Sequence, residues 1–206
     1  MKPEKVVSAS EHIVAFFPRI HKETEAFRVL ISTIISQRNR DDVTERISEK
    51  LFRRYPTYMH LSVLDPEALH PILQESGMFR LKSKWIVEIA KRVERAGGAV
   101  PNRLEALLEF PGVGRKTANI VLSVSFGIPA LAVDTHVHRI SNRIGFVQTK
   151  TPEKTEDVLT RLLPSPLWGP LNGSMVEMGK VVCKPIRPLC SACPVFEDCE
   201  WAEKAR

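Results

Sequence analysis

Apolar residues recur along this chain mostly at the spacing of an α-helix. The segment Ala26–Ser36, AFRVLISTIIS, is apolar on nearly every side, which is typical of a helix buried at the centre of a domain. Two more stripes repeat every four residues, at Val43, Ile47 and Leu51 and at Leu81, Trp85, Ile89 and Val93. No segment alternates apolar and polar residues over the length of a strand, so we predict an all-α fold with little or no sheet.

Capping residues, prolines and glycines indicate where the helices begin and end. We expect Asp41 or Asp42 to cap the helix that carries the first stripe. Pro101-Asn102 is expected to open the helix that follows Gly97-Gly98. Further predicted boundaries are an N-cap at Asp65 before Pro66, a helix stop at Gly77, an N-cap at Asp134 for a helix to about Ile144, and a cap at Thr151 before Pro152. The segment Phe126–Val133 connects two helices, and we predict that the chain crosses there from one lobe to the other.

Composition favours a globular protein with a polyanionic partner. The hydrophobic content is 43% and the charged content 26%, and no apolar run reaches the roughly 20 residues of a membrane-spanning helix. The N-terminal segment MKPEKVVSASEH lacks the apolar core of a signal peptide, so we expect a cytoplasmic protein, associated with the nucleoid if the cell is prokaryotic. Lys and Arg number 30 against 24 Asp and Glu, which gives a net charge of +6. We expect a monomer with no membrane partner.

A tight Pro-Gly-Val-Gly turn separates two apolar-periodic segments in LEFPGVGRKTANIVL, residues 108–122. Gly112 and Gly114 permit backbone angles that other residues resist, and they let another backbone come close. The helix that begins near Arg115 directs its N-terminal N–H groups and positive dipole end into the turn, an arrangement that binds phosphate. The segment therefore predicts a clamp for a nucleic-acid backbone. The simpler alternative is a helix–helix turn with solvated charges.

Lys116 stands at the start of the same helix. The helix dipole and the adjacent charge of Arg115 both favour the neutral amine, and a neutral amine can attack carbon and form a Schiff base. A nearby carboxylate would oppose that shift but stabilise positive charge in a transition state, and the sequence leaves the balance open. Asp134, in LAVDTHVHRISNR, is such a carboxylate; taken alone it is better interpreted as a plain N-cap, and the two roles are compatible. His136 is a possible DNA contact.

The four cysteines gather near the C-terminus, at Cys183, Cys190, Cys193 and Cys199. A disulfide framework needs an oxidising compartment, for which the sequence gives no signal. Structural zinc sites commonly pair two short Cys-x2–4-Cys loops, and only one is present here. Four thiolates at uneven, compact spacing also suit a [4Fe–4S] cluster. The residues by themselves favour cluster and zinc equally.

The loop between the first two cysteines carries Lys184 and Arg187, stiffened by Pro185 and Pro188. We expect a basic finger that contacts phosphate. The alternative is a solvated loop.

Together these motifs resemble the endonuclease III family. LEFPGVGRKTANIVL is similar to its helix-hairpin-helix, VDTHVHR to its catalytic-aspartate motif, and the cysteine spacing matches its iron–sulfur loop in all three intervals. The resemblance covers essentially the whole chain. It implies a two-lobed all-α fold: residues 22–129 would form a six-helix barrel, and residues 1–21 and 130–206 a lobe with a [4Fe–4S] cluster on the four cysteines. DNA would bind at the cleft between the lobes.

The resemblance also implies base excision repair of double-stranded DNA that contains damaged bases or abasic sites. Lys116 would attack the sugar C1′ of a flipped pyrimidine, and Asp134 would assist its deprotonation and stabilise the developing positive charge. The Schiff base would permit β-elimination, so the protein would be a bifunctional DNA glycosylase/AP lyase that removes oxidised pyrimidines such as thymine glycol. The alternatives are a G·T/G·U mismatch glycosylase, a non-catalytic helix-hairpin-helix DNA-binding module and a redox sensor.

Two more positions carry a role implied by the resemblance. Gln37 matches a glutamine that fills the gap left by the flipped base, and Met78 an apolar wedge against the opposite strand. From the residues alone, Gln37 is a polar helix end and Met78 a core residue. The other implied DNA contacts are Gly112, Gly114, Arg115, Thr117, His136, Lys184 and Arg187. Arg38, Asn39 and Arg40 replace the family's small residues and aspartate, which predicts added phosphate contacts or a change in the base tolerated opposite the lesion.

Overall fold

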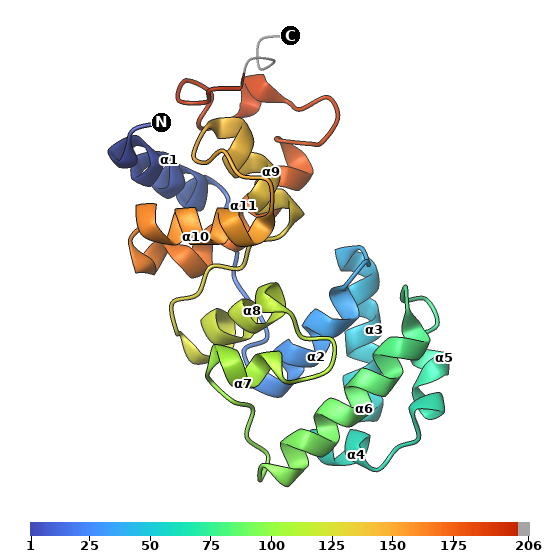
Figure 1. Cartoon of the computed structure of the whole chain (residues 1–206). Helices are drawn as coiled ribbons and strands as arrows, with labels where there is room; N and C mark the ends of the chain where they lie inside the picture. Colours follow the sequence, from blue (N-terminus) through green and yellow to red (C-terminus); the bar gives the residue numbers. More distant parts are fainter. Residues whose placement is uncertain (202–206) are drawn as a thin grey trace. The chain divides into compact units, whose positions relative to one another are not determined.

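The computed structural model describes residues 1–201, which fold into helices joined by turns (Figure 1). No strand occurs in these residues, which confirms the predicted all-α class. The chain divides into two compact units. One is Lys22–Ile128, and the other combines Met1–His21 with the residues from Pro129 onward. None of the helices in the described part of the chain has the length and apolar character needed to cross a membrane.

The unit Lys22–Ile128 is built on the apolar helix α2 (Ala26–Ser36). The Glu25 carboxylate caps this helix, accepting hydrogen bonds from the N–H groups of Phe27 at 3.0 Å and Arg28 at 2.8 Å. Apolar side chains on several sides of α2 are buried, because it packs against α3, α6 and α8. The other elements are α3 (Asp41–Arg54), α4 (Tyr58–Ser62), a 3-10 helix (Pro66–Leu69), α5 (His70–Leu73), α6 (Phe79–Arg95), α7 (Leu104–Leu108) and α8 (Arg115–Phe126).

Several predicted boundaries in this unit are wrong by a few residues. The N-cap of α3 is Arg40, and Asp41 and Asp42 lie in the first turn of the helix. Their negative charges interact favourably there with the positive end of the helix dipole. Helix α7 begins at Leu104 rather than near Pro101. Likewise α5 ends at Leu73, before Gly77. The predicted N-cap at Asp65 is confirmed, since its carboxylate accepts from Glu67 N–H at 3.1 Å.

The second predicted apolar stripe holds only in part. Ile89 and Val93 of α6 are fully buried, but Leu81 is 42% exposed and Lys82 is buried in its place. An α-helix turns 100° per residue, so a repeat of four drifts by about 40° at every step. Over the three steps from Leu81 to Val93 the drift amounts to about 120°. The first member of the stripe therefore leaves the buried face.

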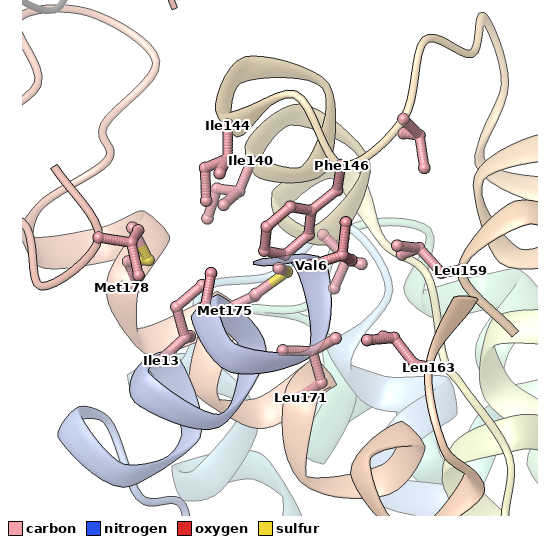
Figure 2. Packing of buried hydrophobic residues seen from close by; sticks show 14 of the residues in the cluster. Val6, Ile13, Ile140, Ile144, Phe146, Leu159, Leu163, Leu171, Met175 and Met178 are labelled. Atoms are coloured by element: carbon pink, nitrogen blue, oxygen red, sulfur yellow. The ribbon is translucent and has the colours of Figure 1, made fainter. Parts of the chain in front are cut away.

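The second unit joins the N-terminal helix to the C-terminal part of the chain around one core. Val6 and Ile13 of α1 (Pro3–Phe16) lie among Leu171, Met175 and Phe146 (Figure 2). Cys183, Cys193 and Cys199 pack against the same core from its edge. The remaining elements are α9 (Thr135–Ile144), α10 (Pro152–Leu162), α11 (Trp168–Val181) and two 3-10 helices (Ser165–Leu167 and Cys190–Ala192). The predicted cap at Thr151 is confirmed, because its hydroxyl accepts from Lys154 N–H at 3.3 Å.

Candidate active site and cysteine cavity

The hairpin turn, residues 111–114, joins α7 to α8. It contains two glycines, of which Gly112 is required by the geometry and Gly114 is not. Gly112 has φ +75°, and a Cβ there would overlap the indole of Trp85. Gly114 differs: its φ is −101°, and apart from Gly114 and its two chain neighbours, no atom of the described residues comes within 4 Å of a Cβ placed there. Gly114 is the N-cap of α8, which confirms the predicted start of that helix at Arg115. It is also exposed, so its backbone is accessible to a ligand.

The side chains of the first turn of α8 differ in exposure. Arg115 is exposed, Lys116 is half-buried and Thr117 is only 4% exposed. The Thr117 side chain is therefore buried rather than available on the surface of this helix end. The positive end of the helix dipole lies here, so it attracts phosphate.

Gln37 is tied to the hairpin turn. It follows the last residue of α2, which agrees with a polar helix end, and its Nε2 donates to Gly112 O at 2.8 Å. Met78 precedes α6 with φ +62° and is 39% exposed, so the interpretation as a core residue is wrong. Gln37, Met78, the hairpin turn and Lys116 thus belong to one unit of the fold.

Asp134 belongs to the other unit and caps α9, as predicted. Its Oδ1 accepts hydrogen bonds from His136 N–H at 2.8 Å and Val137 N–H at 2.9 Å. Both bonds use the same oxygen, so capping does not occupy Oδ2. One carboxylate can therefore hold the helix terminus and still present negative charge to a ligand.

His136 is packed more closely than the sequence indicated. Its ring lies against Gly179 of α11, where a Cβ would overlap Nδ1, and Arg139 Nη2 lies 3.3 Å from the same nitrogen. Its role as a DNA contact stays a prediction.

The four cysteines are half-buried, none forms a disulfide, and all four line one cavity together with Arg143, Met178 and Trp201. No group of three or more His, Cys, Asp or Glu side chains within residues 1–201 is arranged to hold a single metal ion. A tetrahedral zinc needs its ligands about 2.3 Å from one centre. A [4Fe–4S] cluster is larger and takes one thiolate at each of four irons, so it suits four cysteines around a shared cavity.

Burial raises the pKa of the Cys193 thiol to about 11, and the charges of the other three cysteines act in the same direction. A thiolate at Cys193 is therefore costly without a bound cationic centre. The donor set fits an iron–sulfur cluster for this reason.

Arg143 organises the loop around this cavity, a role that sequence reasoning missed. Its Nη1 donates to Lys184 O at 2.6 Å and lies 3.8 Å from Cys183 Sγ, while its Nη2 donates to Pro185 O at 2.8 Å. The guanidinium also stacks 4.4 Å from the Trp201 ring centroid. The signal for this role is the spacing of Arg139 and Arg143, one helical turn apart, because Arg139 Nη2 donates to Cys183 O at 2.9 Å.

The predicted basic finger is exposed at its tip. Arg187 is exposed and has φ +51°, an uncommon angle for a residue with a side chain, and Ile186 is 80% exposed. Lys184 is half-buried near the base of the finger. The finger is thus held at its base by Arg143 and presents Arg187 to solvent.

Comparison with known proteins gives concordant matches. Residues 31–165 match the family described as HhH-GPD superfamily base excision DNA repair protein. The chain is 59% identical to Endonuclease III of Thermotoga maritima over 193 residues, which cover 93% of this chain and 91% of that protein. It is 34% identical to Endonuclease III of Bacillus subtilis over 180 residues, covering 86% and 82%.

Solved structures agree. A non-covalent Endonuclease III–DNA complex matches with a TM-score of 0.89 at 30% identity, covering 97% of this chain and 96% of that one. A trapped Endonuclease III–DNA covalent intermediate gives the same values. A thermostable thymine-DNA glycosylase matches in fold, with a TM-score of 0.87 at 23% identity and 98% of each chain covered.

Proposed function

This chain belongs to the endonuclease III family within the HhH-GPD superfamily of base excision DNA repair proteins, and we propose that it removes oxidised pyrimidines such as thymine glycol from double-stranded DNA. It is a DNA glycosylase and AP lyase of base excision repair. The observation that carries the proposal is Lys116, a half-buried lysine in the first turn of α8, the helix that follows the hairpin turn. A monofunctional glycosylase needs no amine there.

The proposed reaction begins with the damaged nucleotide flipped out of the stack, because its glycosidic bond is inaccessible inside the duplex. The hairpin turn and the N-terminus of α8 hold backbone phosphate next to the lesion. The neutral amine of Lys116 attacks C1′, and the bond between C1′ and the base breaks as the electron pair leaves with the base. Asp134 assists deprotonation of the amine and stabilises the positive charge that develops at the sugar.

The lyase step follows from the same covalent bond. After loss of a proton from nitrogen and opening of the sugar ring, Lys116 is joined to C1′ as a protonated Schiff base. This iminium acidifies the C2′ hydrogens, so removal of one expels the 3′ phosphate by β-elimination. The strand is nicked 3′ to the lesion, and water later releases the free lysine.

We further propose that Cys183, Cys190, Cys193 and Cys199 hold a [4Fe–4S] cluster. When bound, the cluster would offset the negative charge of the four thiolates and cross-link the loop that carries Arg187. The protein purified without oxygen should contain about four irons per chain. One equivalent of zinc and no iron would contradict this assignment.

The second candidate is a G·T or G·U mismatch glycosylase with the same lysine. Arg38 and Arg40 favour it, because both are exposed beside Gln37, where they can alter recognition of the base opposite the lesion. Either activity would be expected in the cytoplasm, on the nucleoid of a prokaryotic cell.

The test is borohydride trapping on duplexes that contain thymine glycol, a G·T or G·U mismatch, or an abasic site, because borohydride reduces a Schiff base to a stable amine. We expect covalent capture on thymine glycol and abasic DNA and none with Lys116→Gln, which should still bind duplex. Capture on mismatches alone would favour the second candidate. No capture on any duplex would contradict Schiff-base chemistry and leave a DNA-binding module.

A further inference from the structure

Lys82 is the charged residue within residues 1–201 whose exposed fraction is zero. It lies in the first turn of α6, on the buried side of the helix, where most of the other residues are apolar. Its Nζ donates three hydrogen bonds, to Ile35 O at 2.8 Å, Gln37 O at 2.6 Å and Ser76 Oγ at 2.8 Å. An ammonium has three donors, so this set uses all of them.

These acceptors lie in two parts of the chain: Ile35 and Gln37 at the C-terminal end of α2 and in the turn that follows it, and Ser76 in the turn that precedes α6. The first turn follows α2 and carries Gln37; the second precedes α6 and carries Met78. Asn39 connects the same turns: its Nδ2 donates to Ile35 O and to Ser76 Oγ, both at 2.8 Å, and its Oδ1 accepts from Gly77 N–H at 3.0 Å. Lys82 and Asn39 therefore form one polar network that ties the two turns together.

Both turns hold a residue in the left-handed region without a glycine. Arg38 has φ +58° and Met78 has φ +62°. Such angles persist only where surrounding contacts fix them. The hydrogen bonds of the network hold the residues next to them in the chain: Gln37 and Asn39 flank Arg38, and Gly77 precedes Met78. Gln37 extends it to the hairpin turn through its bond to Gly112 O.

An apolar side chain would suit the buried position of Lys82 at lower cost, because a buried charge loses its hydration. Burial lowers the pKa of this lysine to about 8. The ammonium is thus kept against an energetic penalty, and what it provides is the geometry of the Gln37 and Met78 turns.

We propose that Lys82 is a positioning residue for base flipping: its ammonium holds the Gln37 turn and the Met78 turn at a fixed separation, so that both side chains enter the base stack at the same step. The inference rests on the proposed function, because filling the gap and wedging the opposite strand matter only if a base is flipped. A displaced turn would leave one side of the opened step unsupported. Small misplacements in a reacting complex cost large factors in rate.

The experiment compares Lys82→Met, which keeps an unbranched side chain one atom shorter and removes all three donors, with Lys84→Met, which removes the same charge from an exposed position on α6. Single-turnover base removal is measured on a duplex with thymine glycol. Unstacking is followed by the fluorescence of 2-aminopurine opposite an abasic analogue. Borohydride trapping on a single-stranded abasic oligonucleotide reports Lys116 without any duplex to open.

We expect Lys82→Met to lower base removal by about ten-fold to a hundred-fold and to abolish the 2-aminopurine signal. Trapping on the single strand should stay within about two-fold, and Lys84→Met should match the wild type in all three assays. If Lys82→Met matched the wild type in the rate of base removal and in 2-aminopurine fluorescence, the proposal would be overturned. An equal loss on the single strand would also overturn it, because the damage would then be general. Absence of single-strand trapping in the wild type would instead refute the proposed function.

Ser76→Ala gives the same test without removing a buried charge. It deletes the hydroxyl that both Lys82 and Asn39 use, and a small, buried side chain is exchanged for another small one. If Lys82→Met does not fold, Ser76→Ala should show smaller losses of the same kind: slower base removal and a weaker 2-aminopurine signal, with single-strand trapping unchanged. A wild-type pattern in a folded Ser76→Ala would overturn the proposal.

Discussion

Replacing Gly112 by alanine should destabilise the protein far more than the same change at Gly114, although both glycines lie in one turn. At Gly112 the φ of +75° costs an alanine roughly 1–2 kcal/mol. Its Cβ would also overlap the indole of Trp85, and overpacking of this kind typically costs roughly 1–3 kcal/mol. The sum is about 2–5 kcal/mol, against a total of about 5–15 kcal/mol for a typical domain.

At Gly114 an alanine would meet neither a positive φ nor a steric overlap. The backbone is extended and the described surroundings leave room for a Cβ, so only a poorer N-cap remains, at under about 1 kcal/mol. Both variants would be unfolded in urea and followed by far-UV circular dichroism, with the free energy of unfolding taken from the midpoint and slope. Gly112→Ala should also slow borohydride trapping, since the turn directly precedes Lys116. Free energies of unfolding that agree within about 0.5 kcal/mol would refute the steric argument.

Three other predictions concern separate groups. Asp134→Asn should retain the cap of α9 and the free energy of unfolding but slow base removal, whereas Asp134→Ala should also lose about 1 kcal/mol of stability; a normal rate in the Asn variant would limit Asp134 to capping. Removing Lys184 and Arg187 should weaken binding about equally on all sequences and reduce its salt dependence, measured by titration at several salt concentrations; a sequence-specific loss would contradict phosphate contact. Between pH 8 and 10.5 the folded protein should bind fewer protons at Lys82 than the unfolded chain does. The free energy of unfolding of the wild type, measured in urea, should therefore rise by up to about 3 kcal/mol relative to that of Lys82→Met over this range. A difference between the two proteins that stays constant with pH would contradict the lowered pKa.

Local features of the structure could be predicted from the sequence because they depend on neighbours in the chain. Asp134 and Thr151 cap the helices that they precede, and Arg115 begins the helix after the hairpin turn. Each depends on a side chain and on N–H groups only two or three residues away. The all-α class follows from the same short-range periodicity.

Only the tertiary structure determined which groups meet across long stretches of chain. Gln37 bonds to Gly112 across 75 residues, and Arg143 holds Lys184 O across 41. The periodicity placed Leu81 on the apolar stripe, yet Leu81 is exposed and its neighbour Lys82 is buried. Helical periodicity indicates which residues share a face, but the packing of α2 against α6 determines which face is buried. The same packing places the carbonyl groups of Ile35 and Gln37 where they accept hydrogen bonds from the Lys82 ammonium. Such partners are set by the fold as a whole, so no local pattern in the sequence encodes them.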